Sequence, residues 1–133
     1  MKTFASIFLG SVLFLLAAGS QERKPQAQTL PVYDVSHQET FTGSVQEVRD
    51  YKCPVSGTVG AHLTVKGLAE VIEVHLAPSA FLKEYEIKFK AGDKVAVVGT
   101  RVTFEGKPAL LARSVKVGQE TYIFRDEKGR PLW

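Results

Sequence analysis

Apolar and polar residues alternate over short segments along most of the chain, which is the pattern of half-buried β-strands. The segment 39–52 ("ETFTGSVQEVRDYK") places its apolar residues on one side of such a pattern. Two further alternating segments, 62–66 and 70–76, stand on either side of the short break 67–69. We therefore predict three strands, of which the second and third form a hairpin.

The second half of the chain begins with a helical signal and then returns to strands. Ser79 is placed to cap a short helix that carries Phe81, Leu82 and Tyr85. The β-branched segments 94–104 and 108–117 follow, joined by a turn at 105–107.

Within 94–104 the alternation changes phase at Gly99, which predicts a bulge or a sharp bend. The last segment, 120–133, predicts a closing hairpin with its turn at 127–129.

Five strands with one short helix between the third and the fourth is the element order of the OB-fold, a small five-stranded barrel. A strand that bends at a glycine helps to close a barrel of this size. We predict an all-β, five-stranded OB-fold-like barrel with an additional C-terminal hairpin, and we place this domain at residues 39–133.

The first twenty residues predict a secretory signal peptide, because Lys2 precedes an apolar run that ends in small residues. Cleavage after Gly19 and cleavage after Ser20 fit equally well, and an uncleaved membrane anchor is the alternative, although the run is short for a bilayer span. Residues 21–38 are polar, contain proline and lack a period, which predicts a flexible leader. We expect a periplasmic or secreted protein without a stable membrane span after cleavage.

The charge pattern argues against nucleic acid as the partner. The chain has 17 basic and 14 acidic residues, and removing the signal segment with Lys2 leaves a net charge of +2. Nucleic-acid binders usually carry clustered basic residues. Here the charges are interleaved, as in "KEYEIKFK" at 83–90. The second and third predicted strands also lack the aromatic residues on which single-stranded bases stack.

Two of the three histidines face each other in the predicted hairpin. If the turn is centred between Leu68 and Ala69, directly opposite residues have numbers that add up to 137, and the apolar positions of the two strands then face one another. The same register places His62 opposite His75. Opposite side chains share a face and lie close enough for two imidazoles to bind one metal ion.

Cys53, the only cysteine, lies just upstream, where the loop between the first two strands begins. It has no second cysteine with which to form an internal disulfide. A thiolate with two neutral imidazoles suits zinc or copper and leaves a fourth position open. We therefore predict that Cys53, His62 and His75 bind a transition metal. The alternative is two solvated histidines on an outer face and a cysteine that points into the core.

Two other functions remain open from the sequence. A thiol enzyme would use Cys53 with His62 as its base and Glu73 as the orienting group, but no catalytic motif supports it, so we expect a non-enzymatic binding module. The second is a module for an envelope peptide or a small anion. Its ligand-binding residues would be Lys66, Glu73, Arg101, Arg113, Arg130 and Trp133. The C-terminal residues could instead be structural, with Asp126 and Gly129 shaping a turn and Trp133 covering one end of the barrel.

Three stretches, "VHLAPSAF", "KAGDKVAVVGTRVTFEGKPALLARSV" and "FRDEKGRPLW", carry a resemblance to known proteins. Together they resemble a group of small exported bacterial OB-fold proteins with a domain of the nucleic-acid-binding type. The resemblance covers roughly Glu39 to Trp133. It implies the barrel fold and export, and it implies no catalytic residues. The nucleic-acid label follows the fold, which does not by itself specify a function.

Overall fold

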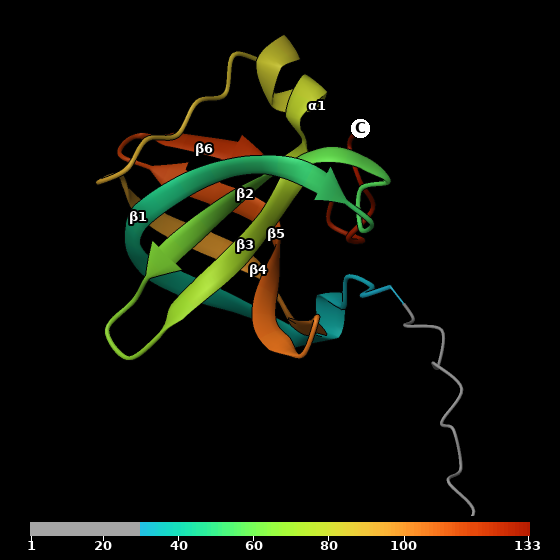
Figure 1. Cartoon of the computed structure of the whole chain (residues 1–133), viewed down its shortest axis with the longest axis horizontal. Coiled ribbons are helices and arrows are strands. Elements are labelled where there is room, and N and C mark those ends of the chain that lie inside the picture. The colour runs from blue at the N-terminus through green and yellow to red at the C-terminus, as the bar shows by residue number, and fades with distance from the viewer. Residues whose placement is uncertain (1–29) are drawn as a thin grey trace, which may run out of the picture.

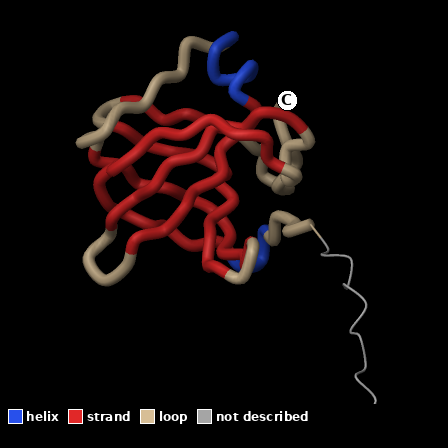
Figure 2. Tube along the Cα trace, viewed as in Figure 1, coloured by secondary structure: helices blue, strands red, loops and turns tan. Residues whose placement is uncertain are grey.

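The computed structural model describes residues 30–133 (Figure 1). The predicted signal peptide and most of the predicted leader lie outside the described residues. The described elements are strands apart from one short 3-10 helix and one short α-helix, as Figure 2 shows. In chain order they are η1 (Val35–His37), β1 (Gln38–Cys53), β2 (Thr58–Lys66), β3 (Val71–Pro78), α1 (Ser79–Glu84), β4 (Lys94–Phe104), β5 (Lys107–Val117) and β6 (Glu120–Ile123).

The first five strands close into a ring. β1 pairs with both β2 and β4, β2 pairs with β3, and β4 pairs with β5. A short parallel pairing of β3 with β5 completes the circle. This ring, with α1 between β3 and β4, is the OB-fold arrangement, so the predicted fold class is confirmed. β6 extends the sheet beyond β5.

The predicted register of the second hairpin is confirmed. His62 pairs with His75, Leu63 with Val74 and Val65 with Ile72. The register shifts between Gly60 and His62, so that Gly60 pairs with Pro78. One face of the hairpin therefore enters the barrel core, and the opposite face carries the two histidines.

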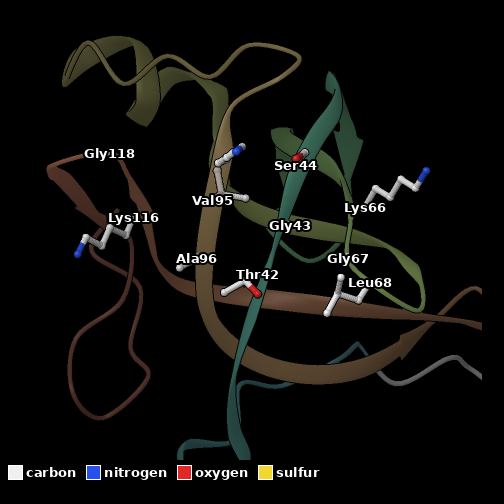
Figure 3. Close-up of a pocket in the computed structure, with 11 residues that line it drawn as sticks. Thr42, Gly43, Ser44, Lys66, Gly67, Leu68, Val95, Ala96, Lys116 and Gly118 are labelled. Carbon is white, nitrogen blue, oxygen red and sulfur yellow. The ribbon is translucent and has the colours of Figure 1, made fainter.

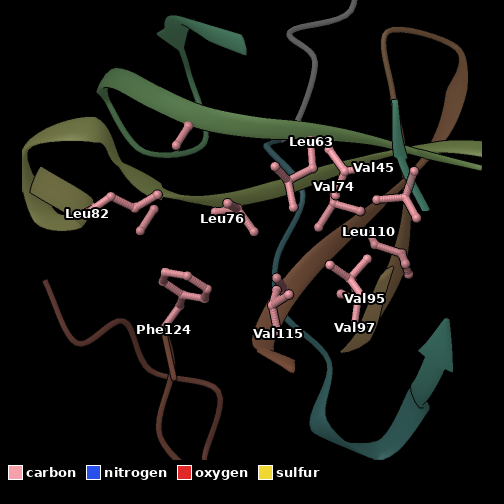
Figure 4. Packing of buried hydrophobic residues seen from close by; sticks show 14 of the residues in the cluster. Val45, Leu63, Val74, Leu76, Leu82, Val95, Val97, Leu110, Val115 and Phe124 are labelled. Carbon is pink, nitrogen blue, oxygen red and sulfur yellow. The ribbon is translucent and has the colours of Figure 1, made fainter. Parts of the chain in front are cut away.

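The core fills the barrel with side chains from several strands and α1 (Figure 4). Phe124, which follows β6, and Leu82 of α1 pack in the same cluster. Burial of this apolar surface supplies the main stabilisation of the fold. The largest labelled members in Figure 4 are Leu63, Leu76, Leu82, Leu110 and Phe124.

The predicted irregularity at Gly99 is confirmed. The pairing of β4 with β5 shifts between Val98 and Gly99, and an added Cβ at position 99 would lie 2.4 Å from the carbonyl oxygen of Leu111. Such a contact is too short for any side chain, so glycine allows the backbones to approach where β4 bends.

The C-terminal segment forms a smaller structure than the predicted hairpin. β6 pairs with β5, and beyond it a single bridge joins Arg125 to Pro131. The Asp126 carboxylate accepts hydrogen bonds from the backbone N–H groups of Lys128 and Arg130, and Gly129 has a φ of 77°. Asp126 and Gly129 therefore shape the turn, as the structural alternative predicted.

Two local predictions differ from the structure. Ser79 starts α1 but does not cap it, because its hydroxyl donates to the Asp50 carboxylate instead. Residues 30–38, where a flexible leader was predicted, include η1, and the Tyr33 hydroxyl donates to the side chain of Gln38. Neither helix of the described chain is long and apolar enough to cross a membrane.

Candidate metal centre

Cys53, His62 and His75 converge at one end of the barrel. Their nearest ligand atoms all lie within 4.8 Å of one another. The Nε2 atom of His62 is 3.0 Å from Nδ1 of His75, and the Cys53 Sγ atom is 3.4 Å from the same nitrogen. The predicted convergence of the three side chains is therefore present in the structure.

Three adjacent strands supply these residues. Cys53 is the last residue of β1, so it ends a strand where the sequence suggested the start of a loop. His62 lies in the middle of β2, four residues after its start, and pairs with His75 on β3. Gly60 leaves room for the cluster, because a Cβ there would lie 3.2 Å from both the Cys53 Cβ atom and the His62 ring.

The cluster is buried, although it faces away from the barrel core. The exposed fractions are 2% for Cys53, 2% for His62 and 5% for His75. Tyr51 stacks on the His62 ring with centroids 3.8 Å apart, and Phe104 meets the His75 ring edge-on at 4.9 Å. The alternative of two solvated histidines is therefore wrong. Aromatic side chains from β1 and β4 cover a face that strand alternation alone assigns to solvent.

Both imidazoles are held in the neutral form that binds metals. Burial and, to a smaller extent, the neighbouring His62 lower the pKa of His75 to about 4, while Glu73 acts in the opposite direction. Burial also lowers the pKa of His62. At neutral pH both rings thus offer a lone pair, which is the state that coordination requires.

The metal-free cluster cannot satisfy its own hydrogen bonds. Nδ1 of His75 carries either one proton or one lone pair, yet it faces both His62 Nε2 and Cys53 Sγ. Among residues 30–133, His62 Nδ1 and His75 Nε2 have no hydrogen-bond partner. Buried polar atoms without partners cost about 1–3 kcal/mol each. A cation between the three ligand atoms would remove the competition at His75 Nδ1.

Glu73 and Tyr51 form a polar layer behind the histidines. The Tyr51 hydroxyl donates a hydrogen bond to the Glu73 carboxylate. Burial and this carboxylate both raise the pKa of Tyr51, so its hydroxyl keeps the proton. Glu73 therefore lies near the site as a fixed negative charge and not as a metal ligand within the cluster.

The C-terminal segment closes the site. A cavity of about 10 Å³ is lined by the three cluster residues together with Arg125 and Trp133. This volume is about that of one water-sized sphere. Sequence reasoning assigned Trp133 to a different function and did not place Arg125, Tyr51 or Phe104 beside the histidines. Strand alternation could have found Tyr51, because it lies two residues before Cys53 and so shares its face.

The residues predicted for the anion-binding alternative do not converge on one site. Arg101 forms ion pairs with Glu39 and Glu70, at 2.8 and 2.7 Å. Arg113 donates to the Asp126 carbonyl oxygen, and the exposed Arg130 pairs with the Asp126 carboxylate. These guanidinium groups are occupied. Arg113 and Arg130 share Asp126 as a partner, whereas Arg101 is held by Glu39 and Glu70.

Lys66 lies elsewhere, at a larger hollow of the barrel. This hollow has a volume of about 660 Å³ and is lined in part by Lys66, Lys94 and Lys116. Figure 3 shows the side chains of Lys66 and Lys116 on opposite sides of it, pointing away from each other. The lysines therefore do not converge on one point.

Comparison with solved structures gives several matching chains, among them one in the crystal structure of the S. pombe Stn1-ten1 complex. The TM-score is 0.49 and the identity 19%, over 62% of this chain and 59% of that chain. This chain thus matches less than two thirds of that protein's length. A search of curated proteins gives no significant match.

A family model matches residues 37–122, which include all three cluster residues and end before Arg125 and Trp133. The match covers well over half of the 133 residues. The chain therefore belongs to the MamS/MamX magnetosome protein family.

Proposed function

We propose that this chain is an exported, non-enzymatic OB-barrel module that binds one transition-metal ion, zinc or copper, through Cys53, His62 and His75. The observation that carries the proposal is the convergence of three buried ligand atoms at contact distance. Export follows from the predicted signal peptide, and the association with magnetosomes follows from the family description.

The spacing of the ligand atoms supports binding without rearrangement of the strands. Zinc lies about 2.0 Å from imidazole nitrogens and about 2.3 Å from thiolates, so its ligand atoms are about 3.3–3.6 Å apart. The two closest pairs of atoms here are 3.0 and 3.4 Å apart. Small rotations of the side chains are enough to admit an ion.

The chemistry of the ligand set limits the choice of metal. Thiolate and imidazole favour zinc and copper, whereas magnesium and calcium require oxygen ligands. The cavity beside the cluster has room for one water-sized group and excludes an organic ligand. This size favours a metal centre over a small-molecule pocket.

The direct test is the metal content of the purified protein. We would express the full chain without a histidine tag in a bacterium that exports it, and measure bound metals by elemental mass spectrometry. We expect close to one zinc or copper per chain. The variants His75→Ala and Cys53→Ser should each retain less than a tenth of it, because two ligands seldom hold these ions.

His37→Ala is the matched control. His37 is exposed and bonds to Asp34, away from the cluster, so this variant should keep its metal. Equal metal content in His75→Ala and His37→Ala would refute the proposal. The mass of the exported protein also tests the predicted signal peptide. Cleavage after Gly19 and cleavage after Ser20 give products whose masses differ by one serine residue.

A further inference from the structure

Arg125 is a buried cation without an acidic partner in the described structure. Its exposed fraction is 8%, and none of the ion pairs among residues 30–133 includes it. Its guanidinium carbon lies 5.3 Å from the Tyr33 ring centroid and 5.0 Å from that of Trp133. One terminal nitrogen donates to the Gly129 carbonyl oxygen, while Nε has no partner among the described residues.

This arrangement holds a positive charge next to the cluster. Burial lowers the pKa of Arg125, but a guanidinium keeps its proton in proteins. The two aromatic faces stabilise the cation without neutralising it. Arg125 and Trp133 line the same cavity as Cys53, His62 and His75, so Arg125 borders the space beside the cluster.

The charges around a bound divalent ion do not cancel. The cation of Arg125 and the two charges of the ion exceed the thiolate of Cys53 and the carboxylate of Glu73 by one positive charge. Asp50, which acts on His62, and Arg49, which acts on Tyr51, have opposite charges and offset each other. An uncompensated charge in a buried site is costly. One monovalent anion at the open position would restore neutrality, and the cavity of about 10 Å³ has room for one small group, such as a halide or a hydroxide ion.

We propose that a divalent ion at this site takes a monatomic halide, such as chloride, as its fourth ligand, and that Arg125 supplies the balancing charge. This inference rests on the proposed function, because it requires the metal. The proposal makes Arg125 a residue of the anion subsite. The rings of Tyr33 and Trp133 hold the Arg125 side chain in place.

The test uses cobalt(II) as the metal, because its visible absorption changes with its ligands. We would load the full-length exported protein with cobalt in sulfate buffer, since sulfate is too large for the cavity, and then titrate chloride. We expect a saturable spectral change with chloride and none with iodide, which is too large. Chloride should also raise the affinity for cobalt, because binding of the two ions is reciprocally linked.

Arg125→Gln removes the charge and should weaken chloride binding at least tenfold while cobalt remains stoichiometric. Arg125→Lys keeps a cation and should retain most of the chloride affinity. Arg130→Gln is the matched control, since Arg130 lies in the same segment but is exposed and paired with Asp126. It should change chloride affinity by less than twofold.

The outcomes separate the two proposals. Stoichiometric cobalt with no chloride response in the unmodified protein overturns the anion subsite and leaves the metal site intact. An equal chloride affinity in Arg125→Gln and Arg130→Gln overturns the role of Arg125. If Arg125→Gln does not fold, the response of the unmodified protein and of Arg125→Lys still decides. Failure to bind cobalt at all would refute both proposals.

Discussion

Two hollows of the barrel differ in size and in how their side chains are arranged. The larger, about 660 Å³, is lined in part by three exposed lysines, of which Lys66 and Lys116 point away from each other. The smaller, about 10 Å³, lies among a buried thiol, two neutral imidazoles and a buried guanidinium. Volume alone favours the first as a binding site, whereas convergence of desolvated groups favours the second.

The difference follows from what covers each region. Tyr51, Phe104 and the C-terminal segment enclose the outer face of the β2–β3 hairpin, so the polar groups there interact in a low dielectric. The lysine-lined hollow has no such cover, and solvent screens its charges. The chemistry of a site in this small barrel therefore depends more on the covering segments than on the strands.

The largest difference between the two hollows should be in the effect of metal on stability, because only the smaller one is proposed to bind it. A ligand that binds only the folded state at 100 to 1,000 times its Kd stabilises by about 3–4 kcal/mol. We expect an increase in unfolding free energy of this size when zinc is added to the metal-free protein. Urea unfolding followed by circular dichroism measures it.

Cys53→Ser should abolish that increase. Lys66→Gln, in the larger hollow, should leave it unchanged. Trp133 gives a second readout, because it is the only tryptophan and lines the smaller cavity. Copper(II) should quench its fluorescence in the unmodified protein and not in Cys53→Ser, and quenching of equal size in both would contradict the site.

Acid should lower the unfolding free energy of the metal-free protein, because it protonates the buried histidines of the same cluster. The pKa of His75 is about 4 in the folded chain, against an ordinary value of 6.5. Between these values the unfolded chain binds the proton and the folded chain does not, so stability falls as pH decreases from about 6.5 to 4. We expect a loss on the order of 2–3 kcal/mol. Urea unfolding at pH 7, 5.5 and 4 measures it.

His75→Gln should reduce this pH dependence, because it removes one of the two buried histidines whose pKa is lowered. His37→Ala should not, since that side chain is exposed. A slope that is equal in His75→Gln and in the unmodified protein would show that other groups cause the acid sensitivity.

The sequence predicted the barrel and the histidine pair because both depend on local rules. Alternation fixed the register of β2 and β3, and that register places His62 opposite His75. The burial of the pair could not be predicted in the same way, because Phe104 and Arg125 come from segments far along the chain. The ion pairs of Arg101 with Glu39 and Glu70 could not be predicted either, because the closure of the barrel brings these three residues together.

Tyr51→Phe tests the polar layer behind the cluster. Its effect on the unfolding free energy should be smaller than the effects of metal or of acid. The ring stays stacked on His62, but the hydrogen bond to Glu73 is lost. We expect a loss of about 1 kcal/mol in unfolding free energy. Metal affinity should fall only a few fold, because Tyr51 supports a ligand without bonding to it. Competition with a chelator measures that affinity, and loss of the metal would instead assign Tyr51 a direct part in binding.

Neutralising the lysines of the larger hollow should have the smallest effect of all. A triple variant, Lys66→Gln, Lys94→Gln and Lys116→Gln, removes three exposed charges from the lining of this hollow. Exposed substitutions of this kind usually change stability by no more than about 0.5 kcal/mol each. Metal content and chloride response should be unchanged, because these side chains do not line the smaller cavity. A fall in either would show that the two hollows are coupled through β2, which carries both Lys66 and His62.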